Sequence, residues 1–434
     1  MYHFVGIKGA SMSALAGIMH SLGYEIQGSD SEEYYYTEDE LKDQGIKILT
    51  PSKDNIKEGM YIIKGNNYTD DNIEIERAKE LNLPIYTYQQ MVGRLTKLFT
   101  TIAVSGTHGK TATTALLSHV IGNIEGCNYL VAAGKGYASK ENKKFVVEAR
   151  EYGRHFLEYH PTYSIITNIE MDHVDYYNNI DDLLDAYRQY IINTEKMVLA
   201  CGDDRYTKFI KTNRPVFYYG LDEDNEIIAK DVNYTEKGIS FDVFVEDNYY
   251  GHFDLPIYGK HALLNALAVI GICYYERYDV KEVSKHLKSF TGINKRFMET
   301  KVNKTIMIED YAHHPTQIKY TIKAAKQKYP NKKIITVLEP LNYSRTEKLG
   351  EAIAEALNLS DYSYVTDIFK GKENKEDYPN ITSDLIIKHL KNGEYIGDDD
   401  SHKLVKHKDD VIIFMSPNDA LGLKDELIEK LKGE

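Results

Sequence analysis

Short apolar runs alternate with amphipathic segments along most of the chain. The first run, YHFVGI, precedes a segment in which apolar residues between 14 and 22 recur at helical spacing, and EIQGSD follows it. This order predicts a strand, a loop, a helix and a second strand. Three further runs predict strands in IKIL, MYIIKGN and LPIYTY, and this first α/β unit ends near Leu98.

A second unit begins with FTTIAVSGTHGKTATTALLSHVI, which predicts a strand, a tight loop and a helix. The runs FVVEA, YSIITNI and KMVLACG predict buried strands of a parallel sheet. From about Glu226 to Tyr258 the pattern changes to period two, in IIAKDVNY, GISFDVFV and NYYGHFDL. These segments predict a small antiparallel insert, and KHALLNALAVIGICYYE predicts the helix that follows it.

A third unit begins near Asn294. Its predicted strands are KTIMIED, KKIITVLEP, YSYVTDIF and DDVIIFMS, and its final helix is LKDELIEKLKG. No period of about 20 to 50 residues repeats, which excludes a solenoid. The sequence therefore predicts an α/β protein of three domains, over residues 1–98, 99–293 and 294–434.

Composition and charge narrow the class of protein. Hydrophobic residues make up 42% and charged residues 27% of the 434, which is typical of a folded globular protein. The net charge of -13 disfavours binding to nucleic acid or to an anionic membrane. No apolar run approaches the roughly 20 residues that span a bilayer, and the first residues show no basic region with a cleavage site. Three cysteines without C-x-x-C spacing disfavour a disulfide framework or a zinc site, so we expect a cytoplasmic protein.

The segment Gly106-Thr-His-Gly-Lys-Thr111 lies between a predicted strand and a predicted helix. In that position, backbone N–H groups and the helix N-terminus face an anion, and glycines allow it to approach closely. Lys110 would then reach the β- and γ-phosphates, and the Thr111 hydroxyl would bind Mg²⁺. The segment is shorter than the full phosphate-loop pattern, because Val104 and Ser105 precede Gly106. It still predicts a nucleotide site.

A second glycine-containing loop follows the first strand. Gly6 and Gly9 are present, but Lys8 and Ser11 occupy two glycine positions of the dinucleotide fingerprint. Asp30, at the end of the second predicted strand, is placed where an acidic partner of a ribose or base would lie. From the residues alone, two interpretations stay open: a nucleotide-diphosphate site and a purely structural turn.

Acidic and histidine side chains at the same predicted sheet edge as the phosphate loop are candidate metal ligands. Glu148 ends a predicted strand, and His173 follows another, beside Asp172 and Asp175. Magnesium keeps several waters and needs few protein ligands, so these residues are sufficient for one or two ions. A lone histidine is more often a surface or capping residue, and that alternative stays open for His173.

His313 and His314 follow the predicted strand KTIMIED and precede Pro315, which suits the first position of a helix. Two adjacent histidines do not form a metal motif. These residues alone therefore predict a polar loop at a sheet edge with a helix cap.

Seven blocks, in this order and spacing, resemble the Mur ligase family: GIKGASMSALAGIMHSLGYEIQGSD, VSGTHGKTATT, VVEAREYGRHF, TNIEMDHVDYY, YGKHALLNALAV, NKRF and EDYAHHPTQI. Within that family they are most similar to the Gram-positive type that joins L-alanine to UDP-N-acetylmuramate. The resemblance implies a Rossmann-like UDP-sugar domain, a central ATPase domain of the phosphate-loop type and a C-terminal Rossmann-like domain for the amino acid. It also implies ATP and Mg²⁺ as cofactors, an acyl-phosphate intermediate, and a monomer or homodimer.

The resemblance assigns roles to individual residues. For ATP it implies the loop Gly106, Thr107, His108, Gly109, Lys110, Thr111 and Thr113, and also His261, Asn265 and Asp310 near adenine and ribose. For magnesium it implies Thr111, Glu148 and His173, with Glu151 able to share the task. For catalysis it implies Lys110, Glu148, His173 and Arg296. For the UDP-sugar and the amino acid it implies Gly6, Gly9, Ser11, Met12, Ser13, Asp30, His313 and Arg345.

The third predicted domain departs from the family pattern. Its relatives have roughly F-Q-P-H where this chain has Leu338-Glu-Pro-Leu341, and Gly-Ala-Gly-Asp where it has Ser416-Pro-Asn-Asp419. Glu309 and Ser11 also replace an aspartate and a glycine of the pattern. The ATP chemistry is thus expected to be intact, whereas the amino-acid pocket is altered.

Three hypotheses follow from these residues. The first is a ligase that joins L-alanine to UDP-N-acetylmuramate in peptidoglycan synthesis. The second is a divergent paralogue with the same chemistry on another amine or another carboxylate. The third is a nucleotide-binding regulatory protein that has lost turnover, and the presence of Lys110, Thr111, Glu148 and His173 argues against it.

Overall fold

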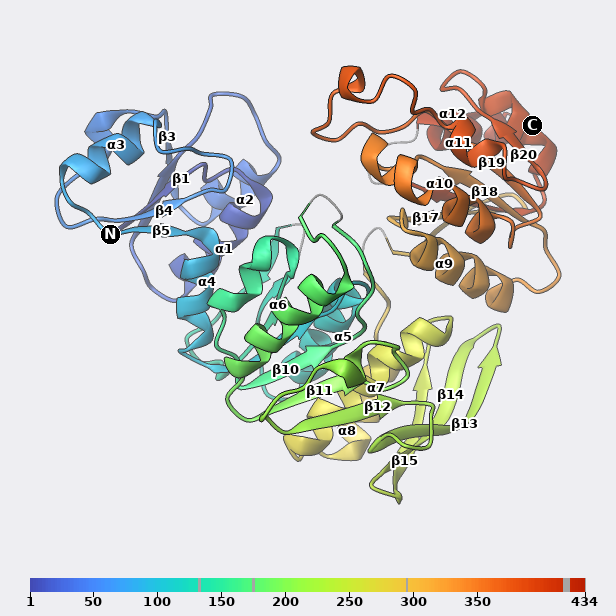
Figure 1. Cartoon of the computed structure of the whole chain (residues 1–434), viewed down its shortest axis with the longest axis horizontal. Coiled ribbons are helices and arrows are strands. Elements are labelled where there is room, and N and C mark those ends of the chain that lie inside the picture. Colours follow the sequence, from blue (N-terminus) through green and yellow to red (C-terminus); the bar gives the residue numbers. More distant parts are fainter. Residues whose placement is uncertain (132–133, 174–175, 294–295, 417–421, 434) are drawn as a thin grey trace. The chain divides into compact units, whose positions relative to one another are not determined.

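The computed structural model describes residues 1–131, 134–173, 176–293, 296–416 and 422–433 and contains three sheets with helices packed against them (Figure 1). The α/β class predicted from the apolar runs is confirmed. The chain divides into two compact units. The first contains Met1–Lys230, Val243–Gly251 and Leu264–Leu287, and the second contains Asp231–Asp242, His252–Leu263 and Lys288–Glu434.

The first sheet has five parallel strands in the order β3-β2-β1-β4-β5. Its elements are β1 (Tyr2–Val5), α1 (Ala10–Ser21), β2 (Ile26–Ser29), α2 (Thr37–Asp43), β3 (Lys47–Leu49), β4 (Tyr61–Lys64), α3 (Ile73–Glu80), β5 (Ile85–Thr87) and α4 (Tyr88–Thr96). Phe4 packs with Leu15 of α1 in one apolar cluster, and Val5 packs with Ile75 of α3 in another. The period-3.6 pattern after the first strand therefore formed the predicted helix.

The central sheet has the order β15-β14-β13-β12-β11-β10-β6-β9-β7-β8. Its strands are β6 (Thr100–Ser105), β7 (Asn128–Val131), β8 (Lys135–Tyr137), β9 (Lys144–Glu148), β10 (Tyr163–Ile166), β11 (Met197–Cys201), β12 (Val216–Gly220), β13 (Ile227–Thr235), β14 (Gly238–Val245) and β15 (Asn248–Leu255). The helices between them are α5 (Lys110–Ile124), α6 (Ile180–Ile192), α7 (Lys260–Tyr275) and α8 (Val280–Lys288). Strands β9, β6, β10, β11 and β12 pair in parallel.

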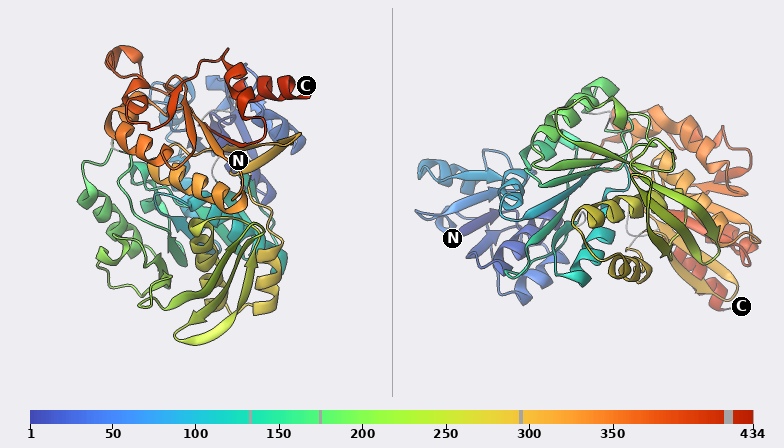
Figure 2. Two further views of the ribbon diagram at one scale, coloured as in Figure 1. Left: turned by 90° about the vertical axis from the view of Figure 1, so that its right-hand side faces the viewer. Right: turned by 90° about the horizontal axis from the view of Figure 1, so that it is seen from below.

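The period-two segments form the strands β13, β14 and β15, as predicted, and these strands belong to the central sheet. They continue the central sheet beyond β12, with Tyr219 of β12 paired to Ile227 of β13 (Figures 1 and 2). Phe241 and Phe253 are fully buried, and their rings stack at 5.9 Å. The alternation thus places one face of these strands in the core and leaves the other polar.

The third sheet has the order β16-β17-β21-β18-β19-β20. Its elements are β16 (Met298–Val302), β17 (Thr305–Asp310), α9 (Pro315–Lys328), β18 (Ile334–Leu338), α10 (Tyr343–Leu357), β19 (Tyr362–Val365), α11 (Asp384–Ile387), β20 (Gly393–Tyr395), β21 (Val411–Met415) and α12 (Gly422–Lys432). Helices α9 and α10 share one apolar cluster with the sheet, and α12 shares another. The side chains of successive strand residues, such as Ile334 and Ile335, alternate between these clusters.

The predicted domain boundary after Leu98 lies in the link between α4 and β6. The boundary at residue 294 falls outside the described residues. Both boundaries stay predictions.

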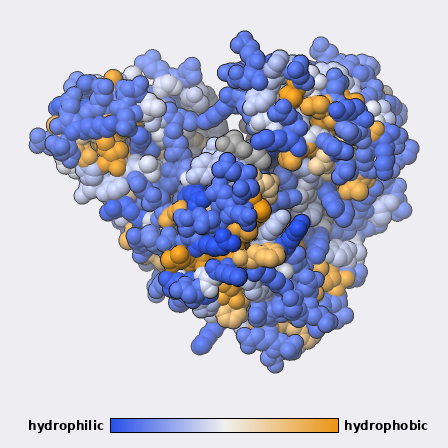
Figure 3. Space-filling model, in the orientation of Figure 1, coloured by the Kyte–Doolittle hydropathy of each residue, from blue (hydrophilic) through white to orange (hydrophobic). Residues whose placement is uncertain are grey.

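The surface seen in Figure 3 is mostly polar, and the three cysteines form no disulfide. The face shown in Figure 3 is mostly hydrophilic, with hydrophobic residues in small separate groups. Within the described ranges, no helix is both long and apolar enough to cross a bilayer. Cys127, Cys201 and Cys273 are buried free thiols, and burial raises the pKa of Cys127 and of Cys201 to about 12.

Candidate active site

The phosphate loop connects β6 to α5, as the sequence predicts. Gly106 has a φ of 131°, and a Cβ at this position would lie 2.1 Å from Thr167 Oγ1. Gly109 has a φ of 85°, and its Cβ would lie 2.8 Å from Asn265 Oδ1 of α7. Both positions therefore require glycine, for the backbone conformation and for the space.

The segment that follows β10 supports the back of this loop. Thr107 N donates to Asn168 O at 3.0 Å, and His108 N donates to Asn168 Oδ1 at 2.9 Å. Thr107 Oγ1 donates to Glu170 O at 3.0 Å, and the His108 ring contacts Glu170 Oε2 at 2.9 Å. The loop is thus fixed in shape by backbone and side-chain groups of the segment after β10, and His108 is turned toward Glu170.

Lys110 lies at the start of α5 and contacts a buried carboxylate. Its Nζ lies 3.0 Å from Glu151 Oε1 and also donates to the carbonyl oxygens of Gly106 and Thr107. Glu151 is only 2% exposed. The Lys110 ammonium group is therefore held inside the loop, where it could bind phosphate oxygens of a nucleotide.

Three further side chains gather around Lys110 and Glu151. Thr111 Oγ1 donates to Glu148 Oε2 at 3.0 Å, and His173 Nε2 lies 3.8 Å from Glu151 Oε1. Glu148 is the last residue of β9, and Glu151 follows it three residues later, directly before the short helix Tyr152–Glu158. The structure thus brings together Lys110, Thr111, Glu148, Glu151 and His173, whereas Asp175 lies outside the described residues.

This cluster fits a magnesium ion. Glu151 Oε2 is buried, and among the described residues it has no hydrogen-bond partner. The residues at these contacts offer a hydroxyl, two carboxylates and an imidazole, and Mg²⁺ prefers oxygen-rich sets of ligands. The residues that would hold the ion are Thr111, Glu148, Glu151 and His173.

The two residues expected near adenine lie on α7. Asn265 is buried beside Gly109 in the first unit. His261, in the second unit, stacks on Tyr320 of α9, with ring centroids 5.1 Å apart and planes within 15°. Burial, and secondarily the charge of Arg296, lowers the pKa of His261 to about 4, so its ring is neutral at pH 7. His261 and Tyr320 thus present a flat, uncharged aromatic pair.

Arg296 and Asp310 also lie together in the second unit. Arg296 Nη1 is 3.8 Å from Asp310 Oδ1, and the guanidinium lies 5.4 Å from the Tyr311 ring centroid. Asp310 accepts hydrogen bonds from Phe297 N at 3.0 Å and from Ala312 N at 2.8 Å. Burial raises the pKa of Asp310, and the positive charge of Arg296 opposes that shift.

The glycine loop of the first sheet is covered by an aromatic side chain. A Cβ on Gly6, whose φ is 83°, would lie 2.1 Å from the Tyr68 ring. Asp30 accepts from Lys8 N at 2.8 Å, from Ser31 N at 2.9 Å and from Tyr68 OH at 3.2 Å. Asp30 is thus placed at the loop, as the sequence predicts, and its oxygens organise the loop itself.

The remaining residues of this loop have distinct positions. Gly9 precedes the first residue of α1, and Ser13 Oγ donates to Ala10 O at 3.0 Å. Met12 is buried in the apolar core, whereas Ser11 hydrogen-bonds to Tyr88 at the start of α4. Met12 and Ser13 therefore belong to the structure of α1 itself, whereas Ser11 links α1 to α4.

Lys8 has a role that the fingerprint comparison did not suggest. Its side chain is 5% exposed, its Nζ donates to Ser31 O at 2.6 Å and to Glu33 O at 2.8 Å, and a Glu38 carboxylate oxygen lies 2.5 Å away. A lysine in place of a glycine therefore fixes the loop between β2 and α2.

In the third sheet, Arg345 lies in the first turn of α10. Its backbone N donates to Asn342 Oδ1 at 3.1 Å, so Asn342 caps this helix. Glu373 accepts from Tyr343 N at 2.7 Å and from Ser344 N at 3.1 Å. The first backbone donors of α10 are thus already bound to side chains of the chain itself.

The two adjacent histidines also have distinct positions. His314 caps α9, with Pro315 at the first helical position, as the sequence predicts. The His313 ring contacts Tyr311 O at 2.8 Å. The predicted turn Ser416–Asp419 is described only at Ser416.

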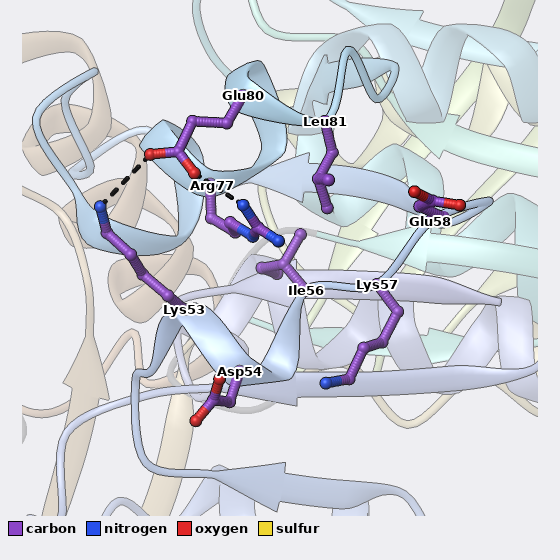
Figure 4. A pocket seen from close by; sticks show the side chains of 8 residues that line it. All are labelled: Lys53, Asp54, Ile56, Lys57, Glu58, Arg77, Glu80 and Leu81. Carbon is purple, nitrogen blue, oxygen red and sulfur yellow. Dashed lines mark hydrogen bonds and ion pairs between the residues drawn. The ribbon is translucent and has the colours of Figure 1, made fainter.

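A separate pocket of about 300 Å³ lies between Lys53–Asn55 and α3, away from the residues above (Figure 4). Glu80 lies 3.5 Å from Lys53 across it and 2.8 Å from Arg77 on the same helix. Asp54, Lys57 and Glu58 also line this pocket.

Models of one family match three successive parts of the chain. They are described as Mur ligase family, catalytic domain, over residues 1–100; Mur ligase middle domain, over 104–273; and Mur ligase, glutamate ligase domain, over 295–419. Together these matches span nearly the whole chain.

Solved structures with the same architecture cover the chain from end to end. The UDP-N-acetylmuramate-alanine ligase MurC of Thermotoga maritima is 27% identical, with a TM-score of 0.77 over 100% of this chain and 99% of that one. A murein peptide ligase of Psychrobacter arcticus is 21% identical, with a TM-score of 0.68 over 100% and 99%. A pseudomurein peptide ligase type C from Methanothermus fervidus is 18% identical, with a TM-score of 0.71 over 99% of each chain. The last two likenesses concern the fold alone.

Three family matches, the order of the three sheets and the cluster around Lys110 agree with one another. The chain therefore belongs to the Mur ligase family, the ATP-dependent amide-bond-forming ligases of peptidoglycan synthesis.

Proposed function

We propose that this chain joins L-alanine to the carboxylate of UDP-N-acetylmuramate in the cytoplasm, with ATP converted to ADP and phosphate. The observation that carries the phosphoryl chemistry is the cluster in which Lys110 contacts buried Glu151, with Thr111, Glu148 and His173 around it. The likeness to the alanine ligase of Thermotoga maritima over both full lengths supports the choice of substrates.

The reaction has two steps. The carboxylate of the sugar nucleotide attacks the γ-phosphorus of ATP, so that ADP leaves and an acyl phosphate forms. The amine then attacks the carbonyl carbon, and phosphate leaves. A carboxylate oxygen is a poor leaving group until it carries phosphate, which is why the reaction needs ATP.

The chain's own residues supply positive charge and backbone donors for the first step. When bound, Mg²⁺ neutralises charge on the phosphoryl oxygens. Lys110 stabilises the charge that is transferred with the γ-phosphoryl group, and it exchanges Glu151 for phosphate oxygens when ATP binds. The loop N–H groups at the start of α5 bind phosphate through the same positive helix end. His261 and Tyr320 offer a flat, neutral surface for adenine.

The first domain is proposed to hold the UDP-sugar. Gly6 and Gly9 allow the backbone to approach a diphosphate, and Asp30, Lys8 and Tyr68 fix the shape of that loop. Arg345 at the start of α10 is proposed to meet the carboxylate of the amino acid. Arg296 is proposed to supply a further positive charge to the phosphates.

The test is phosphate release from ATP with UDP-N-acetylmuramate and each of a panel of amino acids. We expect release that needs both the sugar nucleotide and L-alanine and that is lost in Lys110→Ala. The exposed residue Lys143 provides a control, Lys143→Ala, which keeps wild-type activity.

A second candidate is a ligase of the same chemistry with another acceptor or carboxylate. Glu339 and Ser416, which hydrogen-bond to each other at the edge of the third sheet, favour an altered acceptor site. Release with a different amine, and none with alanine, would establish this candidate. An absence of release with every pair would contradict both.

A further inference from the structure

The carboxyl edge of the third sheet places three strand ends side by side. Asp310 ends β17, Met415 ends β21 and Leu338 ends β18, and Met415 pairs with each of the other two. Backbone bonds extend this pairing: Ser416 N donates to Asp310 O at 3.1 Å, and Glu339 N donates to Met415 O at 2.9 Å. Ser416 and Glu339 therefore stand next to each other at this edge.

The connections that follow β18 and β21 lie on opposite faces of the sheet. After β18 the chain enters α10, whose Ile353 packs in one apolar cluster, and the helix after β21 is α12, whose Leu423 packs in the other. In open parallel sheets, ligands bind outside the carboxyl ends of the strands where successive connections diverge in this way. Ser416 and Glu339 occupy that switch point.

Glu339 has a half-buried carboxylate, which accepts a hydrogen bond from a serine hydroxyl. Ser416 Oγ donates a hydrogen bond to Glu339 Oε2. In the part of the chain that the structure describes, no lysine, arginine or histidine forms an ion pair with Glu339. Burial raises the pKa of Glu339, the negative charge of Asp398 raises it further, and the Ser416 hydrogen bond opposes both.

The other acids at this edge have a different environment. Glu309 forms an ion pair with Lys424 of α12, and Asp310 lies 3.8 Å from Arg296. Their charges are thus compensated within the chain. A partly buried carboxylate without such a cation is stabilised when a positively charged group of a ligand binds to it.

An amino acid at neutral pH carries both a carboxylate and an ammonium group, so its site needs one charge of each sign. Arg345, in the first turn of α10, lies six residues after Glu339, which is the first residue after β18. A cation and an anion therefore flank the same β18–α10 turn.

Resting on the proposed function, we propose that Glu339, oriented by Ser416, binds the ammonium group of the incoming amino acid and accepts its proton before the amine attacks.

The proton and electron balance of this step is simple. An N–H bond of the ammonium group breaks, its proton moves to a Glu339 oxygen, and the nitrogen keeps the electron pair. That pair forms the C–N bond to the acyl-phosphate carbonyl, and the C–O bond to phosphate breaks. The second proton of the attacking nitrogen leaves with the phosphate, and Glu339 returns its proton to water. A carboxylate whose pKa lies above the ordinary range is the better proton acceptor.

The experiment compares the full-length wild type with Glu339→Gln, which keeps the shape and removes the charge. The KM for L-alanine is expected to rise by about 10- to 100-fold, the range of a lost hydrogen bond to a charged group. The pH profile of kcat/KM is expected to move to higher pH, since the amine then loses its proton to solvent. Ser416→Ala is expected to show a smaller change in the same direction.

Hydroxylamine provides the internal control, because it is a neutral nucleophile near pH 7 and needs no carboxylate to hold it. We expect trapping of the acyl phosphate by hydroxylamine to be the same in wild type and Glu339→Gln. Glu355→Gln, on the exposed side of α10, removes an equal charge and is expected to match wild type throughout. Equal KM values for L-alanine in Glu339→Gln and Glu355→Gln would overturn the inference.

Direct binding separates this inference from the proposed function. L-Lactate has the carboxylate and methyl group of L-alanine but a hydroxyl in place of the ammonium group. By calorimetry with ATP and the full chain, wild type is expected to prefer L-alanine over L-lactate by about tenfold or more, and Glu339→Gln to lose that preference. An unchanged preference overturns the role of Glu339. Failure of wild type to turn over UDP-N-acetylmuramate contradicts the proposed carboxylate substrate instead.

Discussion

Lys110 Nζ lies 3.0 Å from Glu151 Oε1, and this carboxylate is almost completely buried. The ammonium group of Lys110 is therefore neutralised by an acid from the connection that follows β9. In the proposed reaction, the phosphates of ATP replace Glu151 as the partner of this lysine, and Glu151 then binds the metal ion. The proposal therefore predicts that the nucleotide and metal sites are coupled through this one contact.

Replacement of this lysine is expected to remove most of the activity. Lys110→Ala leaves the transferring phosphoryl group without its nearest cation, so phosphate release should fall by about 100- to 1000-fold or more. It also leaves the buried Glu151 carboxylate without its charge partner, which destabilises the first unit. Steady-state phosphate release and thermal unfolding measure the two effects, and normal turnover in Lys110→Ala would refute the assignment.

Glu151 is expected to matter more for metal dependence than the acid that ends β9. Glu151 contacts both Lys110 and His173, and its second oxygen is buried and ready for an ion. Glu151→Gln should raise the Mg²⁺ concentration for half-maximal activity by about 10- to 100-fold. Glu148→Gln serves as the matched comparison, and a larger shift in that variant would reverse the order.

Gly109, which directly precedes α5, and Gly122, within α5, form a matched pair. Gly109→Ala forces a left-handed φ of 85° on an L-residue and places its Cβ against Asn265, so it should destabilise the first unit by about 1–2 kcal/mol and weaken ATP binding. Gly122→Ala lies in the helix with its nearest Cβ contact at 4.0 Å, so it should stabilise by up to about 1 kcal/mol. Chemical denaturation of both variants checks the opposite signs.

His261 is expected to make the stability pH-dependent. Its folded pKa of about 4 lies below the ordinary value, so between these two values the unfolded chain binds a proton that the folded chain does not. The contribution of His261 to the free energy of unfolding is thus fully present above its ordinary pKa, and it is lost as the pH falls toward 4. His261→Phe keeps the ring on Tyr320 and removes the proton site. Its thermal midpoint should therefore fall less than that of wild type from pH 7 to pH 4.5.

Asp30 is expected to hold the loop of the first sheet. Its carboxylate accepts hydrogen bonds from Lys8 N, Ser31 N and Tyr68 OH. An asparagine here would place its NH₂ group, a donor, against one or more of these donors. Asp30→Asn should cost about 1–3 kcal/mol of stability and weaken binding of the sugar nucleotide. The exposed Asp43, changed to Asn, should behave as wild type in the same unfolding experiment.

Most of the fold could be predicted because parallel strands are buried on both faces and show as continuous apolar runs. The strands that the apolar runs did not reveal are short edge strands or have ambiguous patterns, such as β8 (Lys135–Tyr137) and β20 (Gly393–Tyr395). Three residues of a strand give no periodicity to detect. The continuation of the central sheet by β13 could not be predicted either, since local alternation does not say which strand is the neighbour.

The candidate site could be predicted only where a local sequence pattern defines it. Lys110 and Thr111 follow from the loop pattern, whereas Glu148 and Glu151 are both plausible from sequence, because both lie near a strand end. Only the course of the backbone after β9 shows that Glu151 faces Lys110. Tyr68 gave no signal, since its contact with Gly6 joins two loops 62 residues apart by their numbers in the chain.

The three buried thiols have a practical consequence. A thiolate, not a thiol, reacts with maleimides, and burial keeps Cys127, Cys201 and Cys273 protonated and out of reach. The folded chain is therefore expected to react very slowly with alkylating reagents. A cysteine introduced at an exposed position could therefore carry a fluorescent dye without removal of any natural cysteine, and the dye would report on the surroundings of that position alone.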